Sequence, residues 1–289
     1  MFIATLIAAD RLTRGDISAA RDALGGSAGH EWVEEGSACD LLLAAPDGAR
    51  ERLEGLIAGV DVVVQPRANR RRKRLLVADM DSTMISVECI DELADYAGRR
   101  AEVAAVTELA MRGALDFESA LEGRVALLRG LEESAIDRCH EERVRITPGA
   151  RALVGTMRAH GAYCLLVSGG FSRFADRVAA EIGFDAALAN HLHVADGRLA
   201  GTVGSPIVGA RGKLDALCAA AAARAIPLDA VMAVGDGAND IPMIAAAGLG
   251  IAYRAKPALA AAADARIEAN DLTALLYAQG YSRKEWAAG

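Results

Sequence analysis

The sequence has few aromatic residues and no excess of positive charge. Phe, Trp and Tyr make up 4% of its 289 residues, and the formal net charge is −7 at pH 7. Few aromatic side chains leave few platforms for base stacking, and a negative net charge attracts neither nucleic acid nor acidic lipid. We therefore expect no nucleic-acid partner and no membrane partner.

Paired cysteines and targeting segments are also missing. The five cysteines form no Cys-x-x-Cys pair, and their odd number favours buried thiols in a reducing compartment. The apolar start from Met1 to Ala9 has no basic residue before it and is too short to span a bilayer. These absences predict a cytoplasmic protein.

The first 66 residues have a pattern of their own, which we predict to be a small α+β domain. We expect strand 2–8, helix 14–24, strands 30–34 and 39–45, helix 47–58 and strand 60–64. This β-α-β-β-α-β order is ferredoxin-like and resembles the ACT regulatory domains that bind amino acids. Six basic residues follow within 67–74. Basic clusters can bind nucleic acid, but this short run without aromatics is interpreted as a solvated linker.

Residues 75–289 are predicted to form a Rossmann-like α/β domain. Strands are expected at 75–78, 163–167 and 231–234, each followed by a polar or glycine-rich loop and a helical stretch. This alternation is typical of a parallel sheet with right-handed crossovers. The insert at about 86–143 is mostly helical, and we expect it to form a small cap that excludes water during chemistry.

Two carboxylates follow the first of these strands. Asp79 and Asp81 are two positions apart, so an extended backbone points both side chains to one side, beyond a sheet edge where α/β proteins bind ligands. Adjacent like charges favour a hard cation such as Mg²⁺. The pair also suits a carboxylate nucleophile beside a carboxylate acid/base. An isolated Asp-x-Asp pair occurs in solvated turns too, so its meaning depends on the rest of the chain.

Two later loops carry groups that could hold a phosphoryl group. Ser168 ends a predicted strand, and the glycines after it, beginning with Gly169, let backbone N–H groups approach a phosphoryl oxygen. Lys213 begins an alanine-rich helix, where its ammonium can neutralise a phosphate, with Arg211 as a rival for this role.

A third loop brings two more carboxylates. Asp236 and Asp240 follow the strand predicted at 231–234. Asp236 is suited to bind Mg²⁺ directly, and Asp240 to support ligand water or Lys213. Four carboxylates at strand ends would repel one another without a metal, so a purely structural role is hard to explain.

Together these segments resemble the four motifs of the haloacid dehalogenase superfamily. In order, they are Asp79-Met80-Asp81-Ser82-Thr83, Ser168-Gly169-Gly170, Lys213 and Gly235-Asp236-Gly237-Ala238-Asn239-Asp240. The spacing from Lys213 to Asp236 matches the superfamily and favours Lys213 over Arg211. Within it, the segments 87–93 and 111–117 and Arg124 resemble the phosphoserine phosphatase branch, over about residues 75–260.

The resemblance implies a Mg²⁺-dependent enzyme that hydrolyses O-phospho-L-serine through an aspartyl phosphate, the last step of L-serine biosynthesis. Asp79 would be the nucleophile, and Asp81 would protonate the departing oxygen and then activate water. The carboxylates of Asp79 and Asp236 and the main-chain carbonyl of Asp81 would hold Mg²⁺.

The resemblance also implies a set of substrate-binding residues. The phosphoryl group would be held by Ser168, Gly169 and Lys213, and Asn239 would orient the substrate. Glu88 would bind the ammonium of phosphoserine and Arg124 its carboxylate, because a guanidinium suits a bidentate contact. Met111 and Phe117 would form an apolar wall. Alone, these last four residues would be ordinary surface charges and core residues.

Other functions fit part of the pattern. The chemistry motifs do not exclude a phosphatase acting on another small phosphomonoester, or a phosphotransferase to an alcohol such as homoserine, because the insert sets specificity. A third hypothesis is an amino-acid sensor with an inert core, which the intact acidic motifs disfavour. The sequence leaves a homodimer open.

Overall fold

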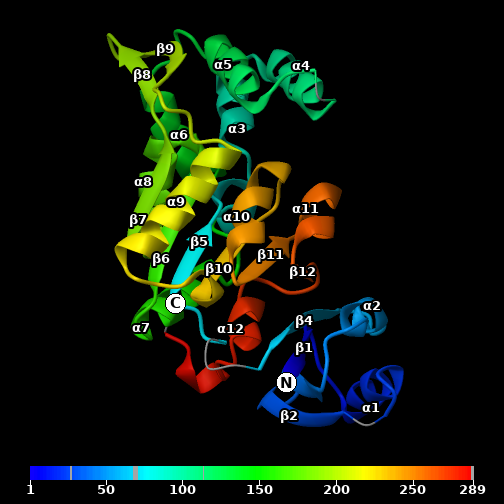
Figure 1. Cartoon of the computed structure of the whole chain (residues 1–289). Helices are drawn as coiled ribbons and strands as arrows, with labels where there is room; N and C mark the ends of the chain where they lie inside the picture. Colours follow the sequence, from blue (N-terminus) through cyan, green and yellow to red (C-terminus); the bar gives the residue numbers. More distant parts are fainter. Residues whose placement is uncertain (27, 68–70, 113, 288–289) are drawn as a thin grey trace.

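The computed structural model describes residues 1–26, 28–67, 71–112 and 114–287, without the side chain of Met111 (Figure 1). Part of the predicted linker, residues 68–70, therefore lies outside the described residues. Ten strands form one sheet in the order β2-β3-β1-β4-β12-β11-β10-β5-β6-β7. No described helix is long and apolar enough to cross a membrane.

The first 66 residues supply four antiparallel strands and two helices that pack on one apolar cluster. Helix α2 is shorter than the predicted span 47–58, because the chain becomes extended at Glu54 and Gly55 takes a φ of +75°. The elements are β1 (Phe2–Ala8), α1 (Arg14–Ala23), β2 (Gly29–Glu34), β3 (Ala38–Leu43), α2 (Ala49–Leu53) and β4 (Val60–Pro66).

The rest of the chain forms an α/β core with a mostly parallel sheet. The strands predicted at 75–78, 163–167 and 231–234 are confirmed, and three strands that the sequence analysis did not predict complete the sheet. The strands are β5 (Leu75–Ala78), β6 (Tyr163–Phe171), β7 (Ala186–Asn190), β10 (Val231–Gly235), β11 (Leu249–Tyr253) and β12 (Ala265–Ile267). Around them lie α7 (Ala150–Ala159), α8 (Ser172–Ile182), α9 (Ala210–Ala223), α10 (Ile241–Ala246), α11 (Pro257–Ala262) and α12 (Ala274–Ala278).

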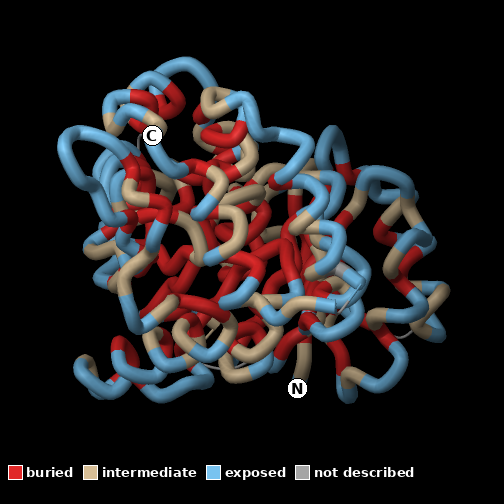
Figure 2. The backbone as a smooth tube through the Cα atoms, turned by 90° about the horizontal axis from the view of Figure 1, so that it is seen from above, coloured by how far each residue is buried: buried red, intermediate tan, exposed pale blue. Residues whose placement is uncertain are grey.

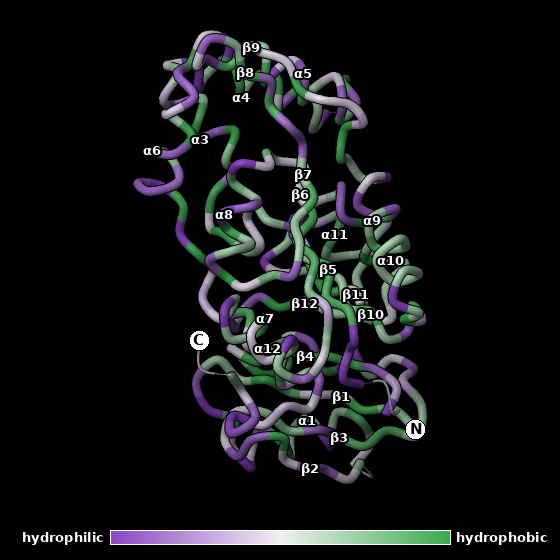
Figure 3. Tube along the Cα trace, turned by 90° about the vertical axis from the view of Figure 1, so that its left-hand side faces the viewer, coloured by the Kyte–Doolittle hydropathy of each residue, from purple (hydrophilic) through white to green (hydrophobic). Residues whose placement is uncertain are grey.

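Helices cover both faces of this parallel sheet because its strands are apolar on both sides. Along β5, Leu75 and Val77 pack with α9, α10 and α11, whereas Leu76 and Ala78 pack with α7, α8 and α12. Buried backbone fills the centre of the molecule in Figure 2, and the central strands run as apolar segments in Figure 3. The sheet is therefore a rigid platform whose strand ends can position a site.

The antiparallel and parallel halves join where β4 pairs with β12 in antiparallel orientation, at Val62 and Arg266. Beside this pair, the carboxylate of Asp61 accepts hydrogen bonds from the backbone N–H groups of Glu268, Ala269 and Asn270 at 3.0 to 3.1 Å. The N-terminal unit is thus hydrogen-bonded to the C-terminal part of the core.

Four of the helices described between β5 and β6 precede α7 and form an insert above the carboxyl ends of the parallel strands (Figure 1). They are α3 (Cys89–Tyr96), α4 (Arg100–Met111), α5 (Phe117–Leu127) and α6 (Ser134–Arg143). Asp116 caps the N-terminus of α5, because its side chain accepts the N–H of Ser119 at 2.7 Å. A hairpin of β8 (Leu192–Ala195) and β9 (Arg198–Val203) contacts α5.

Candidate active site

The two carboxylates after β5 face one cavity. The N–H of Asp79 donates to the carbonyl of Val234 on β10 at 3.0 Å, which fixes the start of the turn. Asp79 and Asp81 both have extended backbone angles, and Ser82 then reverses the chain with a φ of 54°. As the spacing predicted, both acidic side chains line the same cavity, which has a volume of about 750 Å³.

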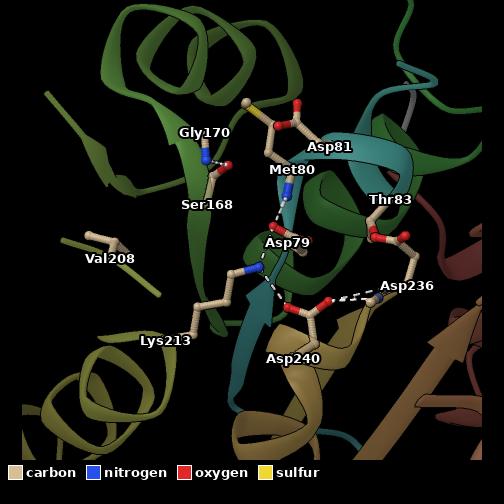
Figure 4. A network of polar contacts seen from close by, with 12 residues as sticks. Asp79, Met80, Asp81, Thr83, Ser168, Gly170, Val208, Lys213, Asp236 and Asp240 are labelled. Atoms are coloured by element: carbon tan, nitrogen blue, oxygen red, sulfur yellow. Dashed lines mark hydrogen bonds and ion pairs between the residues drawn. The ribbon is translucent and has the colours of Figure 1, made fainter. Parts of the chain in front are cut away.

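Lys213 lies beneath this cavity and is fully buried. Its Nζ atom is 2.7 Å from Oδ1 of Asp79 and 2.6 Å from Oδ1 of Asp240 (Figure 4). Burial lowers the pKa of Lys213, but the attraction of the two carboxylates outweighs burial and the pKa is raised overall. Arg211, the rival for this position, is 83% exposed and pairs with Asp215 at 2.9 Å, so it takes no part in the site.

Asp240 has both carboxylate oxygens engaged by the protein. Oδ1 accepts from Lys213, and Oδ2 accepts the backbone N–H groups of Asp236 and Gly237 at 3.2 and 3.1 Å. These contacts shape the loop after β10. Gly235 must be a glycine, because a Cβ there would lie 2.4 Å from the Asp240 carboxylate.

Asp79 and Asp236 are suited to hold a cation. One carboxylate oxygen from each of Asp79, Asp236 and Asp240 lies within 4.8 Å of the other two. Among the described residues, this is the one group of three such side chains that could hold a metal ion. Burial raises the pKa of Asp79 and of Asp236, and the neighbouring charge of Asp240 adds to the effect at both. A hard divalent cation would offset this repulsion, and the oxygen donors are those that Mg²⁺ prefers.

The last residues of β6 allow close backbone approach. The strand was predicted to end at Ser168, but it continues to Phe171, with irregular pairing to β7 after Val167. The N–H of Gly170 donates to Oγ of Ser168 at 2.9 Å, and a Cβ on Gly170 would lie 2.8 Å from Oδ2 of Asp81. A Cβ on Gly169 would lie 2.9 Å from the ring of Phe117, and so would a Cβ on Gly209. The ring at the start of α5 therefore fits between two glycines of the core.

The cavity brings together most of the predicted residues. Its lining includes the acidic pair, the end of β6, part of the loop after β10, and charged and apolar groups of the insert, namely Asp79, Asp81, Glu88, Phe117, Arg124, Ser168, Gly169, Asp236 and Asn239. Lys213 and Asp240 support it from below. The side chain of Met111 lies outside the described residues.

Glu88 and Arg124 place opposite charges on the insert side of the cavity. Oε1 of Glu88 accepts from Oγ of Ser82 at 2.8 Å, and Nε of Arg124 donates to the carbonyl of Ala120 at 3.2 Å. Burial lowers the pKa of Arg124, although Asp91 and Glu88 oppose this effect. One acid and one base thus face the same space.

Two charged residues of the lining were missed in the sequence. Asp91 lies in the first turn of α3, three residues after the N-cap residue Glu88, and this i, i+3 spacing could have given the signal. Lys256 follows β11, and its Nζ lies 3.4 Å from Oδ2 of Asp236. Predicting β11 would have placed Lys256 at the same sheet edge as the four carboxylates.

The comparisons with known proteins agree with this geometry. The profile of the haloacid dehalogenase-like hydrolases matches residues 76–245, and the chain belongs to this family. It is 46% identical to a phosphoserine phosphatase of Streptomyces coelicolor over 233 residues, which are 80% of this chain and 57% of that protein. It is 48% identical to a phosphoserine phosphatase of Idiomarina loihiensis over 202 residues, which are 70% of this chain and 91% of that protein.

A solved structure resembles nearly the whole chain. It is that of a hydrolase of the same family from Salmonella enterica serovar Typhi, with a TM-score of 0.84 and 27% identity, over 96% of this chain and 98% of that one. The chain spans 57% and 55% of the length of the Streptomyces coelicolor relative and of a second one from Mycobacterium tuberculosis, so the activities of those whole proteins enter below as proposals.

Proposed function

We propose that this chain hydrolyses O-phospho-L-serine to L-serine and phosphate with Mg²⁺, the last step of L-serine biosynthesis. The observation that carries the proposal is the shared cavity. Its lining combines residues of the core that are proposed to transfer the phosphoryl group with two opposite charges of the insert, Glu88 and Arg124. The names of the curated relatives support the same substrate.

Asp79 is proposed to attack phosphorus. Its Oδ1 is held by the N–H of Met80 at 2.8 Å and by Lys213, so the carboxylate has a fixed orientation. The new bond joins an Asp79 oxygen to phosphorus, and the bond from phosphorus to the serine oxygen breaks. Mg²⁺ bound by Asp79, Asp236 and the Asp81 carbonyl would supply charge neutralisation.

Asp81 is proposed to move the protons. Burial and then the charge of Glu88 raise the pKa of Asp81 to about 7. Near neutral pH both protonation states are populated, so the acid can protonate the departing serine oxygen and the base can then activate the water that hydrolyses the aspartyl phosphate.

The substrate would be selected by the residues above the phosphoryl site. Ser168, Gly169 and Lys213 are proposed to hold the phosphoryl group and Asn239 to orient the substrate. Glu88 would bind the ammonium and Arg124 the carboxylate, with Phe117 as the apolar wall. The role of Met111 stays a prediction.

A division of the chain into domains is part of the same proposal. We propose that residues 1–66 are an ACT-like regulatory domain, that 67–74 are a linker, and that the insert at 86–143 is a cap on the phosphatase domain 75–289. The β-α-β-β-α-β order and the helical insert support these assignments. A homodimer and a cytoplasmic location also stay predictions.

The test is phosphate release by the purified protein, with Mg²⁺ and with EDTA. The substrates are L-phosphoserine, phosphothreonine, O-phosphohomoserine, glycerol phosphate and a sugar phosphate, with and without alcohol acceptors. We expect a strong preference for L-phosphoserine that EDTA abolishes. Release from another substrate, or transfer to an alcohol, would keep the chemistry and overturn the role of the insert. No release at all would favour an amino-acid sensor with an inert core.

A further inference from the structure

Lys256 is a cation at the edge of the site that no motif includes. It immediately precedes α11 in the loop after β11, and its backbone N–H donates to the carbonyl of Asp236 at 2.8 Å. Its backbone is therefore fixed beside the loop after β10. Its side chain lines the same cavity and is 59% exposed.

The ammonium of Lys256 lies between two carboxylates that have different proposed ligands. Nζ is 3.4 Å from Oδ2 of Asp236, the proposed Mg²⁺ ligand, and 4.0 Å from Oε1 of Glu88, proposed to bind the substrate ammonium. When metal and substrate are bound, Mg²⁺ would therefore lie at Asp236 and the substrate ammonium at Glu88. The attraction between each carboxylate and Lys256 would then be weaker.

The two lysines of the site differ in how firmly they are held. Lys213 is fully buried between two buried carboxylates, so it has no route to solvent. Lys256 is mostly exposed, and exposed ion pairs at such distances are weak and compete with water. A flexible four-carbon stem lets its ammonium swing outward while the backbone stays in place.

We propose that Lys256 is an internal competitor that occupies the space between Asp236 and Glu88 until Mg²⁺ and the substrate ammonium displace it. Loading of either cation frees the lysine and favours loading of the other, because the competitor has already left. The part concerning Glu88 rests on the proposed function, whereas the part concerning Asp236 needs only a metal at that carboxylate.

Mg²⁺ affinity of the metal-free protein tests the first half by calorimetry, without any turnover. We expect Lys256→Met to bind Mg²⁺ about three- to tenfold more tightly than the parent, since a weak competing ion pair is removed. Lys256→Arg should stay close to the parent. Arg254→Met removes an exposed charge two residues away and controls for net charge, with an expected change below about twofold. Unchanged or weaker binding by Lys256→Met would overturn the proposal.

The lysine itself can be observed, because the chain has four lysines. Lys73 and Lys213 are buried, whereas Lys256 and Lys284 are exposed. Reductive ¹³C-methylation of the parent should therefore label few amines, and the resonance lost in Lys256→Met assigns Lys256. We expect Mg²⁺ to shift this resonance and to leave that of Lys284 unchanged. A Lys256 resonance insensitive to Mg²⁺ would show that the lysine does not leave Asp236.

L-Serine, added without Mg²⁺, tests the second half with the same resonance. It carries the ammonium and carboxylate of the proposed substrate, so a shift is expected in the parent and not in Glu88→Gln. A Mg²⁺ response without a serine response would overturn the Glu88 half alone. Failure of phosphoserine hydrolysis is seen separately in the phosphate-release assay, so failure of the proposed function and failure of this proposal can be distinguished.

Discussion

The two halves of the large sheet use buried carboxylates in different ways. In the antiparallel half, Asp40 accepts from Oγ1 of Thr5 at 2.8 Å and from two nitrogens of Arg71 at 2.6 and 2.8 Å. In the parallel half, Asp79 and Asp236 share a cavity with other acids, and burial raises the pKa of both. A buried carboxylate whose oxygens are all hydrogen-bonded by the protein stabilises the fold, whereas a carboxylate that faces a cavity can still bind a ligand or react.

Hydrogen bonds also connect the antiparallel half to the C-terminal part of the chain. Arg71 also donates to the carbonyls of Tyr277 and Ala278, and Gln65 donates to the carbonyl of Ala278 at 2.7 Å. This half therefore contributes to stability through contacts that involve no residue of the cavity. The comparison predicts that substitutions in the two halves affect different measurements.

The largest effect on activity is expected from Asp79→Asn. An amide cannot form the aspartyl phosphate, so phosphate release should fall at least about a thousandfold. Stability should change by less than about 1 kcal/mol, because two effects oppose each other. The ion pair with the buried Lys213 is lost, but so is a buried charge that Asp240 and Asp236 repel. The amide oxygen can still accept from Met80. Phosphate release and urea unfolding measure the two effects. Substantial residual turnover would show that another group is the nucleophile.

Asp40→Ala should produce the opposite result. Removing the acid leaves Arg71, which is 19% exposed, without its carboxylate partner. Breaking such a pair should cost about 3 kcal/mol in the free energy of unfolding. The rate per folded molecule should stay the same. Asp10→Ala, at an exposed position of the same half, is the matched control and should be nearly neutral. A fall in kcat would mean that the halves are coupled in catalysis.

Gly169→Ala tests the contact between the insert and the parallel half. The added methyl group would meet the Phe117 ring at 2.9 Å, so α5 must shift and KM should rise by about tenfold. Gly15→Ala in α1 is the control, because its nearest neighbour would be Oγ1 of Thr13 at an ordinary 3.5 Å. It should stabilise the protein by up to about 1 kcal/mol. Steady-state kinetics in which Gly169→Ala keeps the parent KM would show that the contact between Phe117 and Gly169 does not affect substrate binding.

The smallest effect concerns the pH dependence of stability. The N–H of Ser282 and then Arg72 lower the pKa of Glu285 to about 2, from an ordinary value of 4.5. Its folded pKa is depressed, so its contribution is complete above pH 4.5 and is lost as the pH falls toward 2. The difference in Tm between the parent and Glu285→Gln should therefore shrink between pH 6 and pH 3. A constant difference would show that the charge of Glu285 is irrelevant to stability.

Local sequence patterns correctly predicted where the acidic residues lie at the carboxyl ends of the parallel strands. The positions of Asp79 and Asp81 followed from the period of an extended backbone, and the short apolar runs before them and before Asp236 are strands. The roles of these residues stay predictions until they are measured. Lys213 could be preferred over Arg211 from motif spacing, and the exposure of Arg211 agrees.

Features that depend on distant partners were beyond the sequence. Strand β12 has three residues, and it exists because it pairs with β11 and β4 rather than because of a local period. Lys256 was missed for the same reason, since its position beside Asp236 depends on the neighbouring strands. The early end of α2 depends on one glycine with a positive φ within an otherwise helical pattern.

The single pairing between β4 and β12 also reduces the number of sheet edges at which another chain could add a strand. Two separate sheets would present four strands with unpaired backbone N–H and C=O groups, whereas the joined sheet presents such outer edges at β2 and β7. Unpaired edges are templates on which other chains can add strands and aggregate. Weakening the pairing at Val62 and Arg266 would expose two further templates, so this short contact protects the solubility of the chain as well as joining its halves.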